Sequence, residues 1–204
     1  MEAKYLSQVS SKTIDYTDIR TARIPGVLSQ ANFTQEVETS LSNIRWLLLC
    51  PHLSSITNGS SAPSNTTGGV CSVSESPFTS APATCMPHAS VTNFQIKVGG
   101  KPLWDSPRVY DYDMFMNEVR GNVSMNGGLQ LGLSSGLIDQ RKWAHGYGYI
   151  FVDLSRYGSD AEDLVSKGIR ISGTNNTRCP VDYVCYIGHQ QSFEISTSTG
   201  RITR

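Results

Sequence analysis

The sequence predicts an all-β protein: a jelly-roll β-sandwich with one short helix and a long loop rich in Ser, Thr and Pro. Short apolar runs separated by Gly, Pro and Asn turn residues give about eight strand candidates. Only 38% of the residues are hydrophobic and 17% are charged, a composition typical of many turns and polar strand faces. A chain of 204 residues suits one domain, so we expect a single jelly roll over residues 1–204 with residues 53–89 as a loop insertion.

The N-terminal quarter is expected to supply the first strands. Residues 4–9 and 14–24 have the partial alternation of extended segments, and Pro25-Gly26 is expected to end the second one with a turn. Residues 36–42 are ambiguous between a short helix and a strand. Residues 44–50, IRWLLLC, are predicted to form a core strand.

Pro51 follows that core strand directly. Because proline has no backbone N–H to donate, it is expected to stop the ladder there. From residue 53 to residue 89 the chain is almost entirely Ser, Thr, Pro, Gly, Asn and Ala. This stretch is either a flexible connection between two strands or a surface loop that contacts a neighbour or ligand.

Regular structure is predicted again after this loop. Residues 91–98, VTNFQIKV, alternate like a strand, and Gly99-Gly100 is expected to form the turn after it. Residues 110–120, YDYDMFMNEVR, predict the helix, with Asp111 or Asp113 as its N-terminal cap.

The stretch that we expect to organise the fold is residues 145–156, HGYGYIFVDLSR. Its apolar centre, residues 150–152, predicts a strand that is buried on both faces. Residues 137–143 are expected to lead into it. Three further strands are predicted after it, at residues 169–172, 181–187 and 193–195.

The sequence contains no catalytic, cofactor-binding or metal-binding motif, so we expect no enzyme and no cofactor. All four histidines are isolated in sequence. Two alternatives remain open. One is a zinc set from Cys50, His52, Cys85 and His88; the other is a catalytic cleft around His145, His189 or the Asp111/Asp113 pair.

Charge and cysteine usage restrict the partners and the compartment. With 17 basic and 17 acidic residues, the chain lacks the basic excess that a broad nucleic-acid or membrane surface would need. No apolar run approaches the length of about 20 residues that a membrane span requires. The five cysteines form no CxxC pair, and we expect buried or loop thiols in a reducing compartment, although Cys179 and Cys185 are close enough in sequence to form a disulfide.

Six residues are candidates for structural or interface roles. Large aromatic side chains anchor cores and interfaces, and Asp153 and Arg156 are expected to form an ion pair at the end of the organising strand. The six candidates are Trp104, Tyr112, Phe115, Trp143, Asp153 and Arg156.

The second half of the chain carries a family resemblance. It runs through GKPLWDSPRVYDYDMFMNEVRG, NGGLQLGLSSGLIDQRKW, YIFVDLSRYGSDAEDLVSKGIRISGTNN and FEISTSTGRIT, in residues 91–203. These segments resemble the C-terminal jelly roll of double-jelly-roll viral major capsid proteins, of the adenovirus-hexon-like type found in Polintons, adintoviruses and adomaviruses. In that family the Y-x-x-F helix, here Tyr112 to Phe115, lies between strands of the roll, and the strand matching VDLSR is central.

The resemblance implies a structural capsid protein of the virion, assembled inside the host cell as a homotrimer that contacts other capsid proteins. Such proteins carry two rolls in one chain, whereas this sequence has room for one. The alternative is a non-enzymatic binding module, a lectin-like or receptor-binding β-sandwich whose long loop engages glycan or protein.

Overall fold

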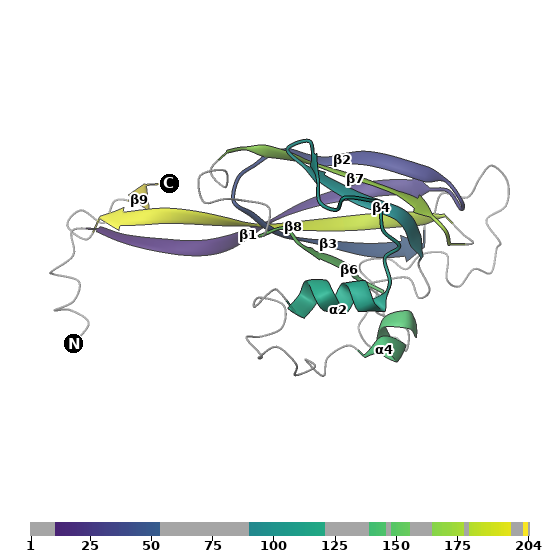
Figure 1. Ribbon diagram of the computed structural model, residues 1–204. Coiled ribbons are helices and arrows are strands. Elements are labelled where there is room, and N and C mark those ends of the chain that lie inside the picture. Colours follow the sequence, from purple (N-terminus) through teal and green to yellow (C-terminus); the bar gives the residue numbers. More distant parts are fainter. Residues whose placement is uncertain are drawn as a thin grey trace.

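The computed structural model describes residues 11–53, 90–120, 139–145, 148–155, 165–177, 180–196 and 202–203. They form two antiparallel sheets packed face to face (Figure 1). The first, the β8 sheet, has the order β1 (Ser11–Val27), β8 (Val181–Ser196), β3 (Ile44–Leu53) and β6 (Ile150–Asp153), and β9 (Ile202–Thr203) also pairs with β8. The second, the β7 sheet, has the order β2 (Asn32–Leu41), β7 (Lys167–Asn175), β4 (Val91–Val98) and β5 (Lys101–Pro102).

The connections between the strands define the topology. Strands β1 to β4 alternate between the two sheets, and β6, β7 and β8 alternate again. The orders β1-β8-β3-β6 and β2-β7-β4-β5 are those of a jelly roll, in which two Greek keys form one sandwich. The predicted fold class is therefore confirmed.

The core lies between the sheets. Leu47 and Ile187 are paired across β3 and β8, and Ile96 and Ile171 are paired across β4 and β7. All four side chains are fully buried in one hydrophobic cluster. Burial of this many branched apolar side chains is the main stabilising contribution to the sandwich, about 1.5–3 kcal/mol for each fully buried side chain.

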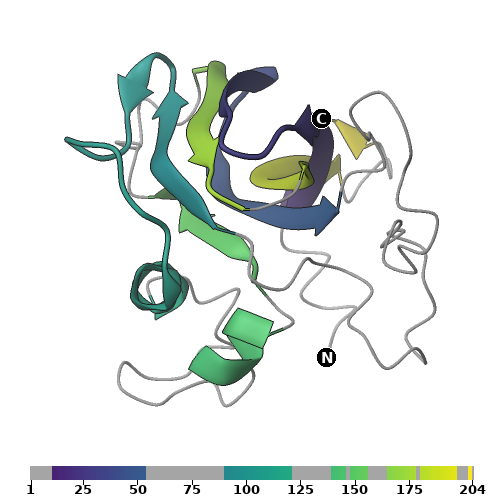
Figure 2. The ribbon, with the colours of Figure 1, turned by 90° about the vertical axis from the view of Figure 1, so that its right-hand side faces the viewer.

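Two helices lie outside the β8 sheet, next to β6 (Figure 2). Helix α2 (Tyr112–Arg120) begins as predicted, because the Asp111 carboxylate accepts a hydrogen bond of 2.9 Å from the Met114 N–H. Helix α4 (Gln140–His145) is a second helix, whereas the sequence analysis predicted one and expected residues 137–143 to lead into the organising strand. The Trp143 ring of α4 packs against the Tyr112 and Phe115 rings of α2, and this contact holds the second helix in place.

The organising strand is shorter and placed differently than predicted. Its four residues, β6, are all buried, as expected, but β6 lies at the edge of its sheet and is not central. Helix α2 packs against β6, so all four of its residues are buried although β3 is the one described strand that pairs with it. The strand with most neighbours among the described residues is β8, which pairs with β1, β3 and β9.

Three further sequence expectations need correction. Residues 181–187 and 193–195 belong to one continuous strand, β8. Pro25-Gly26 lies in a β-bulge inside β1, where the Gly26 N–H donates to Asp182 across 2.6 Å. Strand β3 continues past Pro51, since only β8 pairs with that part of β3 and the missing N–H removes no second ladder.

The remaining strand expectations have clear outcomes. Residues 36–42, left ambiguous, fall mostly in strand β2. Strand β4 and the Gly99-Gly100 turn lie where they were predicted. The extended segment at residues 4–9 and the long loop at residues 54–89 lie outside the described residues.

Candidate functional site

The histidines and cysteines do not form a recognisable reaction centre in the described part of the chain. No group of three or more His, Cys, Asp or Glu side chains there can hold a metal ion. Cys85, His88, Cys179 and the side chain of His145 lie outside the described residues, so the predicted zinc set is represented only by Cys50 and His52. Cys50 and Cys185 are buried cysteines, and burial, with Cys50 nearby, raises the pKa of Cys185 to about 12. A thiol with such a pKa is unreactive at neutral pH.

His52 lies on β3 opposite Asp182 of β8. It is only 4% exposed, and its Nδ1 has no hydrogen-bond partner among the described residues. Burial lowers the pKa of His52; the Asp182 carboxylate opposes this and the Arg23 guanidinium adds to it. Both carboxylate oxygens of Asp182 already have partners, because one forms an ion pair with Arg23 and the other accepts a hydrogen bond from the Gly26 N–H. His52 is therefore a buried neutral side chain in a structural cluster.

Three of the predicted candidates lie on the two helices and pack against one another. The rings of Tyr112 and Phe115 on α2 lie 6.0 and 6.1 Å from the Trp143 ring on α4. Tyr110, which the sequence analysis did not single out, joins them at 6.5 Å from Trp143. The helical spacing of residues 112 and 115 was the signal for the first two. These rings bind the helices to each other and to the sheet, and their role in contacts with another chain stays a prediction.

The same helical layer protects the free edge of β6. The Tyr110 hydroxyl donates to the Phe151 carbonyl and accepts from the Phe151 N–H at 2.9 Å. Two residues along, the Asp153 N–H donates to the Glu118 carboxylate at 3.0 Å. These side chains occupy hydrogen-bonding positions that another strand would need, so β6 is closed to strand addition.

The other two described candidates are also inside the fold. Trp104 packs against Phe94 at 5.7 Å, and its backbone N–H and carbonyl bond the Gln95 side chain. Asp153 is 6% exposed and accepts bonds from the Ser155 N–H and hydroxyl at 3.0 and 2.7 Å. Its predicted ion partner Arg156 lies outside the described residues, so the pair stays a prediction.

One end of the β8 sheet extends past the rest of the sandwich (Figure 1). Residues 11–17 of β1 pair with residues 190–196 of β8, to which β9 adds a third strand, whereas β3 stops pairing at His189. We call residues 11–17, 190–196 and β9 the arm. The β7 sheet does not reach it, so the arm has no opposing layer among the described residues.

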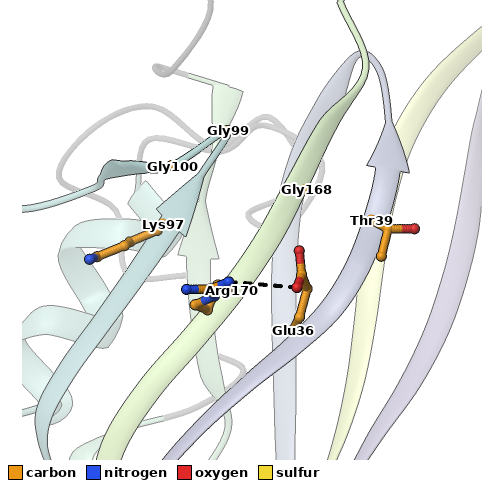
Figure 3. A pocket seen from close by; sticks show the side chains of 7 residues that line it. All are labelled: Glu36, Thr39, Lys97, Gly99, Gly100, Gly168 and Arg170. Atoms are coloured by element: carbon orange, nitrogen blue, oxygen red, sulfur yellow. Dashed lines mark ion pairs between the residues drawn. The ribbon is translucent and has the colours of Figure 1, made fainter.

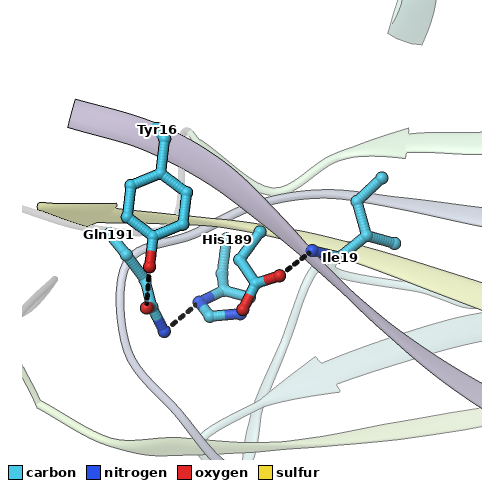
Figure 4. A network of polar contacts seen from close by, with 5 residues as sticks. Tyr16, Ile19, His189 and Gln191 are labelled. Carbon is cyan, nitrogen blue, oxygen red and sulfur yellow. Dashed lines mark hydrogen bonds and ion pairs between the residues drawn. The ribbon is translucent and has the colours of Figure 1, made fainter. Parts of the chain in front are cut away.

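A polar network marks the base of the arm (Figure 4). The Tyr16 hydroxyl donates to the side-chain oxygen Oε1 of Gln191 at 2.8 Å, and the side-chain nitrogen Nε2 of Gln191 lies 3.5 Å from His189 Nδ1. The Nε2 atom of His189 lies 3.6 Å from the Asp18 carboxylate, and the imidazole is only 2% exposed. This network fixes β1 against β8 where β3 ends.

A polar hollow of about 360 Å³ lies on the β7 sheet (Figure 3). Its charged side chains form one row across three strands: Glu36 on β2 is paired with Arg170 on β7, which is paired with Lys97 on β4. The other lining residues are Thr39, Gly99, Gly100 and Gly168. The sequence analysis did not identify this site, because only strand register brings these residues together.

The fold is similar to two solved viral structures. A chain of the Sputnik virophage, solved by cryo-EM, matches with a TM-score of 0.46 and 11% identity over 96% of this chain and 39% of that chain. The mavirus major capsid protein matches with a TM-score of 0.44 and 10% identity over 96% of this chain and 41% of that one. This chain thus spans about two fifths of the length of each.

Identities this low indicate likeness of fold only. No protein-family model and no curated protein matches the sequence.

Among the described residues, none of the helices has the length and apolar character needed to cross a membrane.

Proposed function

We propose that this chain is a structural viral capsid protein, a jelly roll that assembles with copies of itself or with a partner jelly roll. The arm is the observation that carries the proposal. A ribbon of two or three strands without an opposing layer is marginally stable in water by itself. Another chain packed on the arm would supply that layer.

The exposed apolar side chains of the arm support this proposal. Ile202 on β9 is 64% exposed. Ile14 and Phe193, a directly paired couple within the arm, are half-buried. Exposed aliphatic residues on a projecting ribbon are typical of a surface that is covered on assembly.

The two edges of the β8 sheet also indicate where another chain can pair with it. Strand β6 is closed by Tyr110 and Glu118, as described above. Strand β1, at the opposite edge of the same sheet, pairs with β8 on one side and with no other described strand. Its open edge offers backbone groups to a neighbouring chain.

The finer parts of the proposal follow from the sequence resemblance. We expect a homotrimer that contacts other capsid proteins in the virion, without catalytic activity and without sequence-specific binding of nucleic acid. The partner roll would be the first roll that such proteins carry.

The test is the mass in solution, measured by light scattering during size-exclusion chromatography over a concentration series, with and without a first-roll chain. A trimer or larger closed assembly is expected. Ile202→Glu should weaken association, because it places a charge in the covered surface. Val109→Glu is the matched control, since Val109 is 60% exposed but lies away from the arm. A chain that stays monomeric at high concentration and with the first roll would contradict the proposal.

A non-enzymatic binding module is the second candidate function, and the hollow on the β7 sheet is the observation in its favour. A glycan-array screen, repeated after deletion of residues 54–89, tests it. The absence of hits in both screens would remove this candidate.

A further inference from the structure

The row of charges in the hollow contains two cations side by side. Lys97 and Arg170 are directly opposite each other on β4 and β7, so both side chains leave the same face of the sheet. Like charges in such positions destabilise a sheet. Figure 3 shows the result: the Arg170 guanidinium is directed toward Glu36, whereas the Lys97 ammonium is directed the opposite way.

Glu36 compensates only part of this charge. Its carboxylate lies 3.7 Å from the Arg170 guanidinium, and the two side chains are 47% and 54% exposed. An exposed ion pair of this kind contributes little and is easily exchanged for another partner. The row therefore keeps one net positive charge and a guanidinium whose present partner is weakly held.

The remaining lining leaves room for a ligand close to the backbone. Gly99 and Gly100 form the turn after β4, with φ of 57° and 84°, and no atom lies within 4 Å of the place where a Gly100 side chain would begin. Gly168 lies inside strand β7, and its missing side chain leaves the space that the Glu36 carboxylate occupies, 3.2 Å from where a Cβ would be. Thr39 adds a hydroxyl group at the rim.

We propose that this hollow binds the anionic group, a carboxylate or sulfate, of an acidic saccharide, with Lys97 and Arg170 as its ligands. An oxyanion between the two cations relieves their repulsion, and a guanidinium can bind it through two parallel hydrogen bonds. The volume of about 360 Å³ suits a sugar residue. The site does not depend on the proposed capsid role or on the oligomeric state.

The lining argues against nucleic acid as the occupant. None of the seven lining residues is aromatic, so no ring is available for base stacking. Two of the seven lining residues are cations, with the Glu36 carboxylate beside them, whereas stable binding of a phosphate backbone uses several cations.

The test is an NMR titration of the ¹⁵N-labelled full chain with glucuronic acid and glucose 6-sulfate, with glucose as the uncharged control. We expect the amide signals of Lys97, Gly99, Gly168 and Arg170 to shift with the two acidic sugars and not with glucose. Lys97→Gln and Arg170→Gln should each raise the dissociation constant about tenfold, as expected for loss of a charged hydrogen bond. All the substituted side chains are exposed, and a circular dichroism spectrum checks that each variant is folded.

Glu36→Gln separates this proposal from general attraction to a charged surface. It should tighten binding about threefold, because it removes a nearby repulsion and frees Arg170. Lys12→Gln, an exposed cation on the arm, is the matched control and should leave the affinity unchanged. Equal binding of glucose, equal effects of Lys12→Gln and Lys97→Gln, or weaker binding by Glu36→Gln would each overturn the proposal. Binding of a single-stranded oligonucleotide at these residues, with no binding of the sugars, would overturn it in favour of nucleic acid.

Discussion

Gly188 allows Trp46 to lie over the β8 strand, and this contact gives a sharp stability prediction. An ideal Cβ built on Gly188 would be 2.1 Å from the Trp46 Cε2 atom and 2.5 Å from Cζ2 and Nε1. Carbon atoms in contact are normally about 3.5–4.0 Å apart. The Trp46 ring also packs against Phe151, with ring centroids 6.4 Å apart, so it cannot move freely in that direction.

Two effects of Gly188→Ala oppose each other. Replacing glycine by alanine in an extended strand restricts the unfolded chain and stabilises the fold by about 0.4–1 kcal/mol. Forcing a methyl group into occupied space costs about 1–3 kcal/mol, and more where the neighbour cannot yield. The overlap with an indole ring decides the sign, and we expect a net loss of about 2 kcal/mol in the free energy of unfolding.

The assay is urea denaturation followed by far-ultraviolet circular dichroism at one fixed protein concentration, since association would shift the midpoint. The midpoint should fall while the slope m stays unchanged. In a Trp46→Leu background the same Gly188→Ala change should cost nothing or stabilise, giving a coupling energy of about 2 kcal/mol. Gly173→Ala is the graded control, because its Cβ would meet Val91 at 2.9 Å, a milder overlap, and should cost less. A wild-type midpoint for Gly188→Ala would refute the reasoning.

Two further predictions concern buried polar groups. Burial lowers the pKa of His52 below its usual 6.5, so the unfolded chain binds that proton first as the pH falls. The contribution of neutral His52 to stability is therefore complete above pH 6.5 and is lost progressively below it. His52→Leu should flatten the pH dependence of the urea midpoint between about pH 7 and 5. An unchanged pH dependence of the midpoint in this variant would contradict the prediction. Tyr110→Phe removes the hydroxyl that satisfies both backbone groups of Phe151, and we expect a loss of about 1–3 kcal/mol in the same assay; a stability equal to wild type would show that water or another group replaces the hydroxyl.

The sequence pattern predicted the strands that have an ordinary sandwich environment. The sequence of strand β4 and the glycine turn after it predicted the strand with its correct ends, although a register shift after Thr92 leaves residues 94–96 all buried. Strand β6 was predicted as buried on both faces, which it is, but an apolar run reports burial and not position in a sheet. Helix α2 covers β6 in addition to the core between the sheets, and no local pattern shows whether a buried strand lies at the centre or at a covered edge of its sheet.

The errors in β8 have a related cause. The polar run His189-Gln190-Gln191-Ser192 interrupts the apolar pattern between the two predicted strands, residues 181–187 and 193–195. In the structure these residues continue the strand, because β8 leaves the sandwich there and forms the arm. The polar residues of this run reflect the absence of an opposing sheet over this part of β8, which remains a strand.

The hollow on the β7 sheet could not be found from the sequence. Glu36, Lys97 and Arg170 belong to three strands that are far apart in the chain, and each alone is an ordinary exposed charge on an alternating strand. Their juxtaposition depends on the register of β7 against both neighbours. Register is set by the packing of the whole sheet and by its turns, and it cannot be read from the residue pattern of any one strand.

The path of β8 determines how the arm and the sandwich influence each other. Residues 181–189 of β8 pair with both β1 and β3, and Gln190 still bonds Asn43 and Arg45, whereas residues 191–196 pair only with β1 and β9 among the described strands. His189 lies at the boundary, and its buried side chain is part of the network that fixes β1 there. A change in β9, which pairs with residues 194 and 195 of β8, lies away from this boundary, so it should alter association without lowering the free energy of unfolding of the body. Loss of both properties together in Ile202→Glu would mean that the arm and the sandwich fold as one cooperative unit.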